Sequence, residues 1–400
     1  MSDLFRTSVN NKNYGPQRGG EQHPPQPSAR PRPTPIGTGT SPPGIIDDSS
    51  SDSSASSAAS VATVRPSSRE QAAPPTHWTK YFDQELFLEQ KTESQHASYH
   101  VYLTPPVDLK KGPLFVCHHG AGASGLSFAL FAQQVRQRLP SAGILSLEAR
   151  GHGSVVTSAS TGEEIADYSL DTLVADAVSM ITLAAATQAW SPLPPCVLVG
   201  HSLGGAVLTT VAATQFETFG SNLMGYCVID VVEGSAIEAL SHMRTYLASR
   251  PSIFNSVEEA ITWHVRSRTI RDQRSAEASV PSLLVPSPSG NGKLIWRTNL
   301  SATSPWWEEW FKGMSQKFLT GRGAKMLILA GTDRLDKDLM IGQMQGKFQL
   351  TVIPEAGHFV QEDVPEKTAS LLNEFFKRND RSALVLPPKV SELIAQGKKV

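Results

Sequence analysis

One serine stands between two glycines directly after an apolar run, in the pattern Gly200-x-Ser202-x-Gly204. If a strand turns here at once into a helix, the corner residue takes a strained backbone conformation, and a Cβ at either flanking position would clash. Such a turn aims the serine hydroxyl out of the top of a sheet, with the next backbone N–H facing the same space. The pattern predicts a nucleophilic serine. The alternative is a tight strand–helix turn without chemistry.

A serine hydroxyl becomes an effective nucleophile only when a neighbouring base accepts its proton. Of the 11 histidines, His358 is the one in a Gly-containing loop directly after the last expected strand. This position suits the base where the chain order is serine, acid, histidine. We therefore predict His358 as the general base, the alternative being a loop histidine without a role.

Two aspartates between Ser202 and His358 could orient the imidazole. Asp230 ends the strand after the serine and has apolar neighbours, and a carboxylate buried there would need a partner such as an imidazole N–H. Asp333 ends the following strand, which is the commoner location for the acid, but it stands in a charge-rich loop with Arg334, Asp336 and Lys337. Local pattern alone leaves both residues as candidates.

A Gly-rich stretch, HHGAGASG at residues 118–125, follows an early strand. Its backbone N–H groups would face the negative oxygen that develops during acyl transfer. We expect one donor among residues 120–122, with Gly120 and Ala121 as the candidates, and a second donor in the amide of Leu203. His118, His119, Arg150 and His152 are expected to brace this loop rather than to react.

Short apolar segments alternate with helical patterns from residue 76 onward. Strands are expected at 99–103, 113–118, 142–147, 195–200, 225–230, 324–330 and 348–353, and helices at 128–139, 172–187, 205–215 and 364–377. Continuous apolar strands between helices indicate a parallel sheet covered on both faces. The fold class predicted is α/β, namely an α/β-hydrolase fold with a mostly parallel central sheet, helices on both faces and an inserted cap region.

Two regions depart from this alternation. Residues 1–75 hold 12 of the 28 prolines and a serine-rich run at 49–57, so they bury too little apolar surface to offset the entropy of ordering, and we predict a disordered tail. Residues 76–400 are expected to form the hydrolase domain, with about 235–320 inserted as a cap over the strand ends. Within this cap, 279–292 is expected to be a floppy loop. Three tryptophans are expected either to help dock a protein partner or to pack the cap core: Trp306, Trp307 and Trp310.

Composition excludes several function classes. A net charge of −1 with 18% charged residues gives no basic field for nucleic acid. No apolar run approaches the roughly 18 residues of a membrane span, and the first residues lack the apolar core of a secretory signal, so no membrane partner is expected. Three cysteines argue against a disulfide framework and for the cytoplasm, the nucleus or both. No Cys/His spacing resembles a zinc site.

Several longer blocks carry a specific resemblance. GHSLGG at 200–205, YCVIDVVEG at 226–234, AGTDRLDKDL at 330–339, IGQMQGKF at 341–348 and AGH at 356–358 are similar to the protein phosphatase methylesterase family. The resemblance covers nearly all of residues 77–377. It departs from the family in the Gly-rich loop, where Ala121 and Ala123 stand. Alanine keeps its N–H, so an oxyanion donor survives if the backbone angles suit alanine.

The resemblance implies a function and its residues. Members of this family remove the methyl ester from the C-terminal leucine of the protein phosphatase 2A catalytic subunit, which would be the partner here. It implies Ser202 as nucleophile, His358 as base and Asp230, in preference to Asp333, as acid. It also implies no cofactor, with any metal ions contributed by the phosphatase. The rival readings are a general small-molecule carboxylesterase and a non-catalytic protein that binds and inhibits the phosphatase.

Overall fold

The structure is a computed structural model that describes residues 77–331 and 335–380. The predicted disordered tail at 1–75 lies outside the described residues, and so does Asp333.

A mixed sheet forms the centre of the described domain. Its strand order is β1-β2-β4-β3-β6-β7-β11-β12, with β5 paired to β2. The first pairings, β1 with β2 and β2 with β4, are antiparallel, and all those from β4 to β12 are parallel. This confirms the predicted α/β-hydrolase architecture. The strands are β1 (Gln84–Lys91), β2 (Gln95–Thr104), β3 (Leu114–His118), β4 (Gly143–Leu147), β5 (Val155–Ser158), β6 (Cys196–His201), β7 (Leu223–Ile229), β11 (Ala324–Leu329) and β12 (Gln349–Val352).

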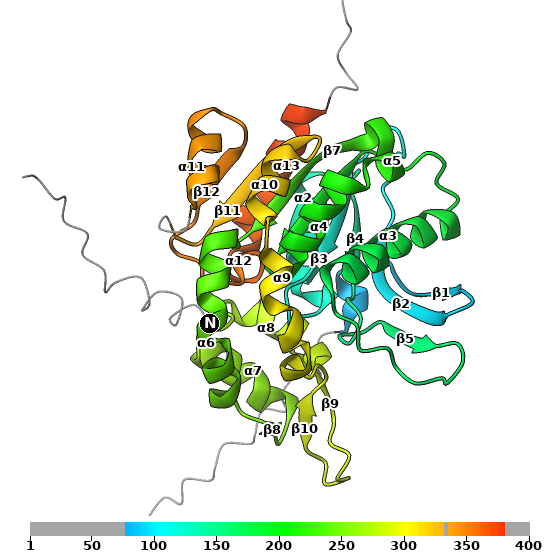
Figure 1. The fold of residues 1–400 in the computed structure, drawn as a ribbon, viewed down its shortest axis with the longest axis vertical. Coiled ribbons are helices and arrows are strands. Elements are labelled where there is room, and N and C mark those ends of the chain that lie inside the picture. Colours follow the sequence, from blue (N-terminus) through cyan, green and yellow to red (C-terminus); the bar gives the residue numbers. More distant parts are fainter. Residues whose placement is uncertain (1–76, 332–334, 381–400) are drawn as a thin grey trace, which may run out of the picture. The chain divides into compact units, whose positions relative to one another are not determined.

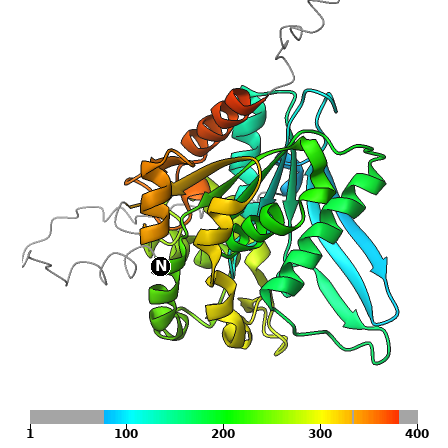
Figure 2. The same cartoon turned by 45° about the horizontal axis from the view of Figure 1, so that its top comes forward.

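Helices cover both faces of this sheet (Figures 1 and 2). Alternate strand residues enter opposite cores, because successive side chains of a strand point to opposite faces. In β7, for example, Val228 packs in the core under α3 and α4, and Cys227 packs in the core under α2 and α13. The layer helices are α2 (Ala129–Arg138), α3 (Leu170–Thr187), α4 (Leu203–Thr214) and α13 (Pro365–Asn379).

A long segment between β7 and β11 adds no strand to the large sheet. Its helices are α6 (Glu233–Ser249), α7 (Val257–Arg266), α8 (Gln273–Ser279), α9 (Trp307–Phe311) and α10 (Met314–Thr320). It also holds a small antiparallel sheet of β8 (Ile253–Phe254), β10 (Leu294–Trp296) and β9 (Leu284–Pro286). We call residues 233–320 the cap segment. The remaining short helices are α5 (Phe216–Phe219), α11 (Lys337–Met344) and α12 (Val360–Asp363).

The expectation of a floppy loop at 279–292 is wrong for its first half. Val280–Leu283 forms a 3₁₀ turn, and β9 pairs with β10 directly after it. The physical reason is burial: Val280 and Leu284 enter a third apolar core with Phe254 of β8. Apolar residues among the prolines and serines therefore order this stretch.

Among the described helices, α3 is long and apolar enough to cross a membrane by length and composition. The expectation that no segment approaches that length therefore does not hold for residues 170–187. Half of its residues are buried within the domain, and Leu173, Ala177 and Ile181 pack against the sheet. Packing in the core accounts for the apolar composition of α3.

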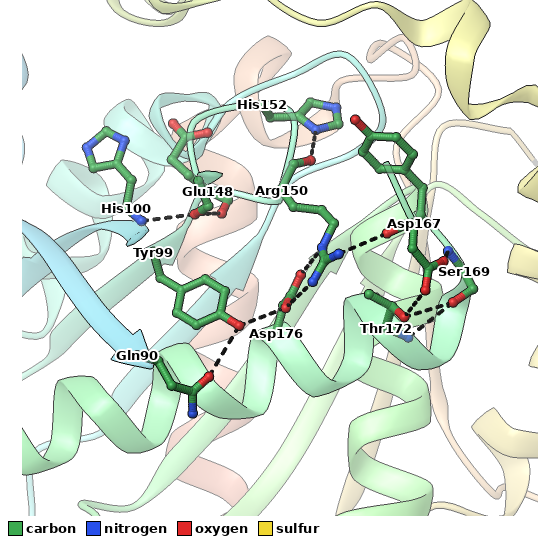
Figure 3. A network of polar contacts seen from close by, with 12 residues as sticks. Gln90, Tyr99, His100, Glu148, Arg150, His152, Asp167, Ser169, Thr172 and Asp176 are labelled. Carbon is green, nitrogen blue, oxygen red and sulfur yellow. Dashed lines mark hydrogen bonds and ion pairs between the residues drawn. The ribbon is translucent and has the colours of Figure 1, made fainter. Parts of the chain in front are cut away.

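A buried ion pair fastens α3 to the loop after β4 (Figure 3). The Arg150 guanidinium donates from Nε to Asp176 Oδ2 at 2.5 Å and from a terminal nitrogen to Oδ1 at 2.8 Å. The Tyr99 hydroxyl also donates to Asp176 at 2.8 Å. Both charged side chains are only 3% exposed. Removal of one partner would leave an uncompensated charge inside the domain.

We predict that Asp176→Ala lowers the free energy of unfolding by about 3–5 kcal/mol, because it leaves the buried Arg150 charge without its ion-pair partner. Urea unfolding monitored by circular dichroism measures this loss. Asp171→Ala is the matched control, since Asp171 is an exposed aspartate in the first turn of the same helix. It should cost less than about 1 kcal/mol. Equal losses in the two variants would contradict a special role for the buried pair.

Candidate active site

Ser202 occupies the sharp corner between β6 and α4. Its backbone angles are φ 51° and ψ −120°, a sparsely populated conformation for a residue with a side chain. Three backbone hydrogen bonds hold it there: the Ser202 N–H donates to the Ile229 carbonyl at 3.0 Å, and the Ser202 carbonyl accepts from the N–H groups of Gly205 at 2.8 Å and Ala206 at 3.3 Å. The surrounding backbone therefore maintains the strain.

The flanking glycines are required by close backbone approach. A Cβ on Gly200 would lie 2.3 Å from the Gly204 carbonyl oxygen, and a Cβ on Gly204 would lie 2.1 Å from the His118 carbonyl oxygen. Both contacts are far below what real Cβ atoms show and involve backbone that cannot move aside. This confirms the steric argument made from the sequence pattern.

His358 and Asp230 come together from the loops after β12 and β7. Nδ1 of His358 donates to Asp230 Oδ2 at 2.8 Å, and Asp230 Oδ1 accepts from the Ala330 N–H at 2.8 Å. The Asp230 side chain is fully buried and that of His358 is 7% exposed. With the proton on Nδ1, the basic position of the imidazole is Nε2. Asp333, the other candidate acid, lies outside the described residues.

Ser202, His358 and Asp230 line one cavity. The structure thus brings together the three residues singled out in the sequence, and their catalytic roles remain predictions. The other walls are mainly apolar, and most of these residues come from the cap segment. The apolar lining residues are Val231, Ala236, Ala239, Leu240, Met243, Leu300, Trp307, Trp310, Phe311 and Phe359.

The Gly-rich loop lies against Ser202. A Cβ on Gly120 would sit 2.9 Å from that of Ser202, so the loop backbone reaches the serine directly. The Gly122 N–H is not available as an oxyanion donor, because it donates to His152 Nε2 at 2.9 Å. The amides of Gly120, Ala121 and Leu203 donate to no other residue in the described ranges. Ala121 does not have a positive φ, so its conformation suits alanine.

Buried neutral histidines hold this loop, as the sequence led us to expect. His119 donates from Nδ1 to the Gly120 carbonyl at 2.8 Å and accepts from the Ala149 N–H at 3.1 Å. His152 donates from Nδ1 to the Arg150 carbonyl at 3.0 Å. Burial lowers the pKa of both imidazoles to about 4. Each ring therefore serves as one donor and one acceptor at neutral pH.

Two further residues fix the His358 loop, and the sequence analysis did not single them out. His201 donates from Nε2 to the His358 carbonyl at 2.9 Å, and the two rings lie 4.7 Å apart. Asp363 accepts from the Gly357 N–H at 2.6 Å and from the Arg271 N–H of the cap segment at 2.7 Å. The position of His201 inside the serine motif was the one available signal.

The tryptophans of the cap segment favour the packing alternative. Trp307 and Trp310 are 7% and 3% exposed, and both line the cavity from inside. Their indole N–H groups donate to Thr303 and to the Tyr168 carbonyl. Surface docking by these two side chains is therefore not supported, while Trp306 is partly buried beside Tyr168.

Among the described residues, no group of three or more His, Cys, Asp or Glu side chains is arranged to hold a metal ion.

Comparisons with known proteins agree with this geometry. The model of the alpha/beta hydrolase family matches residues 115–371. The chain is 51% identical to protein phosphatase methylesterase 1 of Neurospora crassa, over 90% of each chain. It is 57% identical to the protein of the same name from Aspergillus fumigatus, over 80% of this chain and 76% of that one. The corresponding Schizosaccharomyces pombe protein is 45% identical, over 78% and 87%.

Solved structures support the fold alone. A peroxisomal α/β-hydrolase from Saccharomyces cerevisiae superimposes with a TM-score of 0.54 at 14% identity, over 78% of this chain and 93% of that one. E-2-(acetamidomethylene)succinate hydrolase gives a TM-score of 0.53 at 17% identity, over 73% and 99%.

We predict that the protein loses stability in mild acid. The pKa values of His119 and His152 are about 4 in the folded chain, below the usual value of 6.5, so the unfolded chain binds more protons between these limits. The free energy of unfolding should fall as pH drops from 6.5 toward 4, by up to about 1.4 kcal/mol per pH unit for each group.

Urea unfolding at several pH values measures this slope. His152→Gln should make it shallower, and replacement of the exposed His242 should leave it as in the wild type. A slope that is the same in all three proteins would contradict the assignment.

Proposed function

Because the chain belongs to the protein phosphatase methylesterase family of the α/β-hydrolases, we propose that it demethylates the C-terminal leucine of the protein phosphatase 2A catalytic subunit, with Ser202, His358 and Asp230 as its catalytic residues. The observation that carries the assignment is the meeting of a strained serine and a buried His–Asp pair in one cavity. The apolar walls of that cavity suit a leucine side chain. Methyl ester hydrolysis at such a residue needs no cofactor.

In the first half of the reaction, Ser202 Oγ attacks the ester carbonyl carbon while His358 Nε2 accepts its proton. The carbonyl oxygen becomes negative and is stabilised by the N–H of Leu203 and by that of Ala121 or Gly120. These groups suit the role because no other described residue uses their protons. Asp230 holds the imidazole with Nδ1 protonated and stabilises its charged form.

In the second half, the tetrahedral intermediate collapses and methanol leaves with the proton from His358. Water then attacks the acyl-enzyme, again with His358 as base, and the leucine carboxylate and free Ser202 are released. Each step uses the same oxyanion donors. A rigid Gly-rich loop therefore benefits both halves of the reaction.

The proposed function also includes a binding partner, the protein phosphatase, and a place in the cell. A phosphatase as substrate follows from the named relatives, and the 2A catalytic subunit from the sequence resemblance. Three free, buried cysteines support work in the reducing cytoplasm, the nucleus or both.

We predict that Ser202→Ala lowers methanol release from the methylated phosphatase by at least about 10³-fold, because no nucleophile remains. The variant should still bind the phosphatase, which a pull-down with purified protein measures. Residual demethylation at the wild-type rate would exclude Ser202 as nucleophile. A wild-type enzyme that prefers a generic aryl ester to the phosphatase would instead indicate a general carboxylesterase.

The acid is tested with a pair of isosteric variants. Asp230→Asn should lower kcat by about 10³–10⁴-fold, because an amide favours the wrong imidazole tautomer. Asp333→Asn is the matched control and should change kcat less than about tenfold. Single-turnover methanol release gives both rates, and the reverse order would assign Asp333 as the acid.

A further inference from the structure

A second cavity of about 450 Å³ adjoins the first on the other side of the Gly-rich loop. The two cavities share the walls formed by Ala121, Leu300 and Phe359. The second is more polar, and most of its remaining walls come from the cap segment. The two cavities are therefore direct neighbours, which places the second within reach of residues that precede a terminal residue held in the first.

Arg250, the residue that ends α6, lines this second cavity. It is half-buried, and its guanidinium has no hydrogen bond or ion pair with any residue in the described ranges. A guanidinium carries five N–H donors in a rigid fork that matches a carboxylate. A second cation, Arg297, lines the adjoining hollow together with Arg250.

Aromatic packing fixes the position of this arginine. The guanidinium carbon of Arg250 lies 4.3 Å from the centre of the Trp296 ring, so the indole covers one face of the cation. The Trp296 N–H donates to the carbonyl of Pro251, the next residue, at 2.7 Å. Phe254 and Trp263 both pack edge-on against Trp296. The indole covers a face of the guanidinium, so the N–H groups at its edges remain available to bind a ligand in the second cavity.

The carboxyl group in the wall of the second cavity, that of Glu362, does not neutralise the charge of Arg250. Glu362 is the one acidic residue among those lining the second cavity in the described part of the chain. It accepts a hydrogen bond from the Ser279 hydroxyl at 2.6 Å, and burial raises its pKa to about 8, so it is mostly protonated at pH 7. Arg250 therefore faces the cavity as an uncompensated positive charge.

We propose that the second cavity is a subsite for an acidic side chain of the substrate, which pairs with Arg250. This rests on the proposed function, since it places the methylated residue in the first cavity. Because the two cavities share three wall residues, we place the acidic residue among the few positions directly before the ester, and the test below scans these positions one at a time. The subsite selects tails that combine an apolar terminal residue with a nearby carboxylate.

The test uses synthetic hexapeptides that end in a leucine methyl ester. Each carries aspartate or its neutral isostere asparagine at one of the three preceding positions, and kcat/KM for methanol release is measured with the full-length enzyme. At one position, aspartate should raise kcat/KM about five- to tenfold over asparagine, and 0.5 M salt should reduce the ratio.

Arg250→Gln should bring this ratio close to one, and Arg250→Lys should retain part of it, because a lysine keeps the charge but not the fork. Arg244→Gln is the matched control, since it removes the same charge from an exposed position on α6. It should keep the wild-type ratio. If Arg250→Gln does not fold, as judged by its thermal melt, the Arg250→Lys variant and the salt dependence decide.

The possible failures are distinguishable. Turnover of every peptide with no preference for aspartate, or the same preference in Arg250→Gln and the wild type, overturns the subsite and leaves the proposed function intact. No turnover of any peptide ester or of the methylated phosphatase, with an aryl ester still hydrolysed, overturns the proposed function and the subsite with it.

Discussion

The end of β6 and the start of α4 meet backbone against backbone, and the arrangement of the whole site depends on that contact. Gly200 and Gly204 have no room for a methyl group, so α4 can begin directly beneath the carbonyl of His118 at the end of β3. This closeness forces Ser202 into its strained conformation and brings the Gly-rich loop alongside it. The strain costs on the order of 1–3 kcal/mol, and the neighbouring strands supply the hydrogen bonds that offset it. The strained, partly buried serine and the unused amides beside it thus have one common cause.

The Gly-rich loop needs a second kind of support, because a loop with free N–H groups has few internal bonds to hold it. A continuous series of contacts supplies that support from α3, and Figure 3 shows its part from Asp176 through Arg150 to His152. Asp176 binds Arg150, the Arg150 carbonyl accepts from His152, and His152 accepts from the Gly122 N–H. Asp176, Arg150 and His152 are buried, and the His152 imidazole is neutral, so it can donate from Nδ1 and accept at Nε2 at the same time. Helix α3, which does not line the cavity, thereby helps to hold the loop whose amides lie next to the serine.

The sequence predicted the elements that carry strong local patterns, and it missed those set by long-range pairing. The parallel strands were recognisable because each is a short apolar run, and the serine turn because glycine spacing reports a steric requirement. β1 and β5 were not predicted, since both have exposed and polar positions and owe their form to pairing with β2. The partners of Asp176 and Asp363 were equally hidden. A carboxylate in a helix or loop gives no sign in the sequence of which distant N–H or guanidinium it will meet.

The cap segment contributes both to the walls of the proposed substrate cavity and to the position of His358, the proposed base. Its apolar side chains close the cavity over Ser202, while Arg271 of the same segment and Gly357 of the His358 loop share the carboxylate of Asp363. Burial makes this sharing strong, since the Asp363 side chain is 1% exposed and the pairing is screened little by solvent. A displacement of the cap that moves Arg271 would therefore remove one of the two backbone N–H groups that position the Asp363 carboxylate beside the His358 loop. The cap segment thus supplies both apolar walls of the cavity and one of the contacts that hold the His358 loop, beside those made by Asp230 and His201.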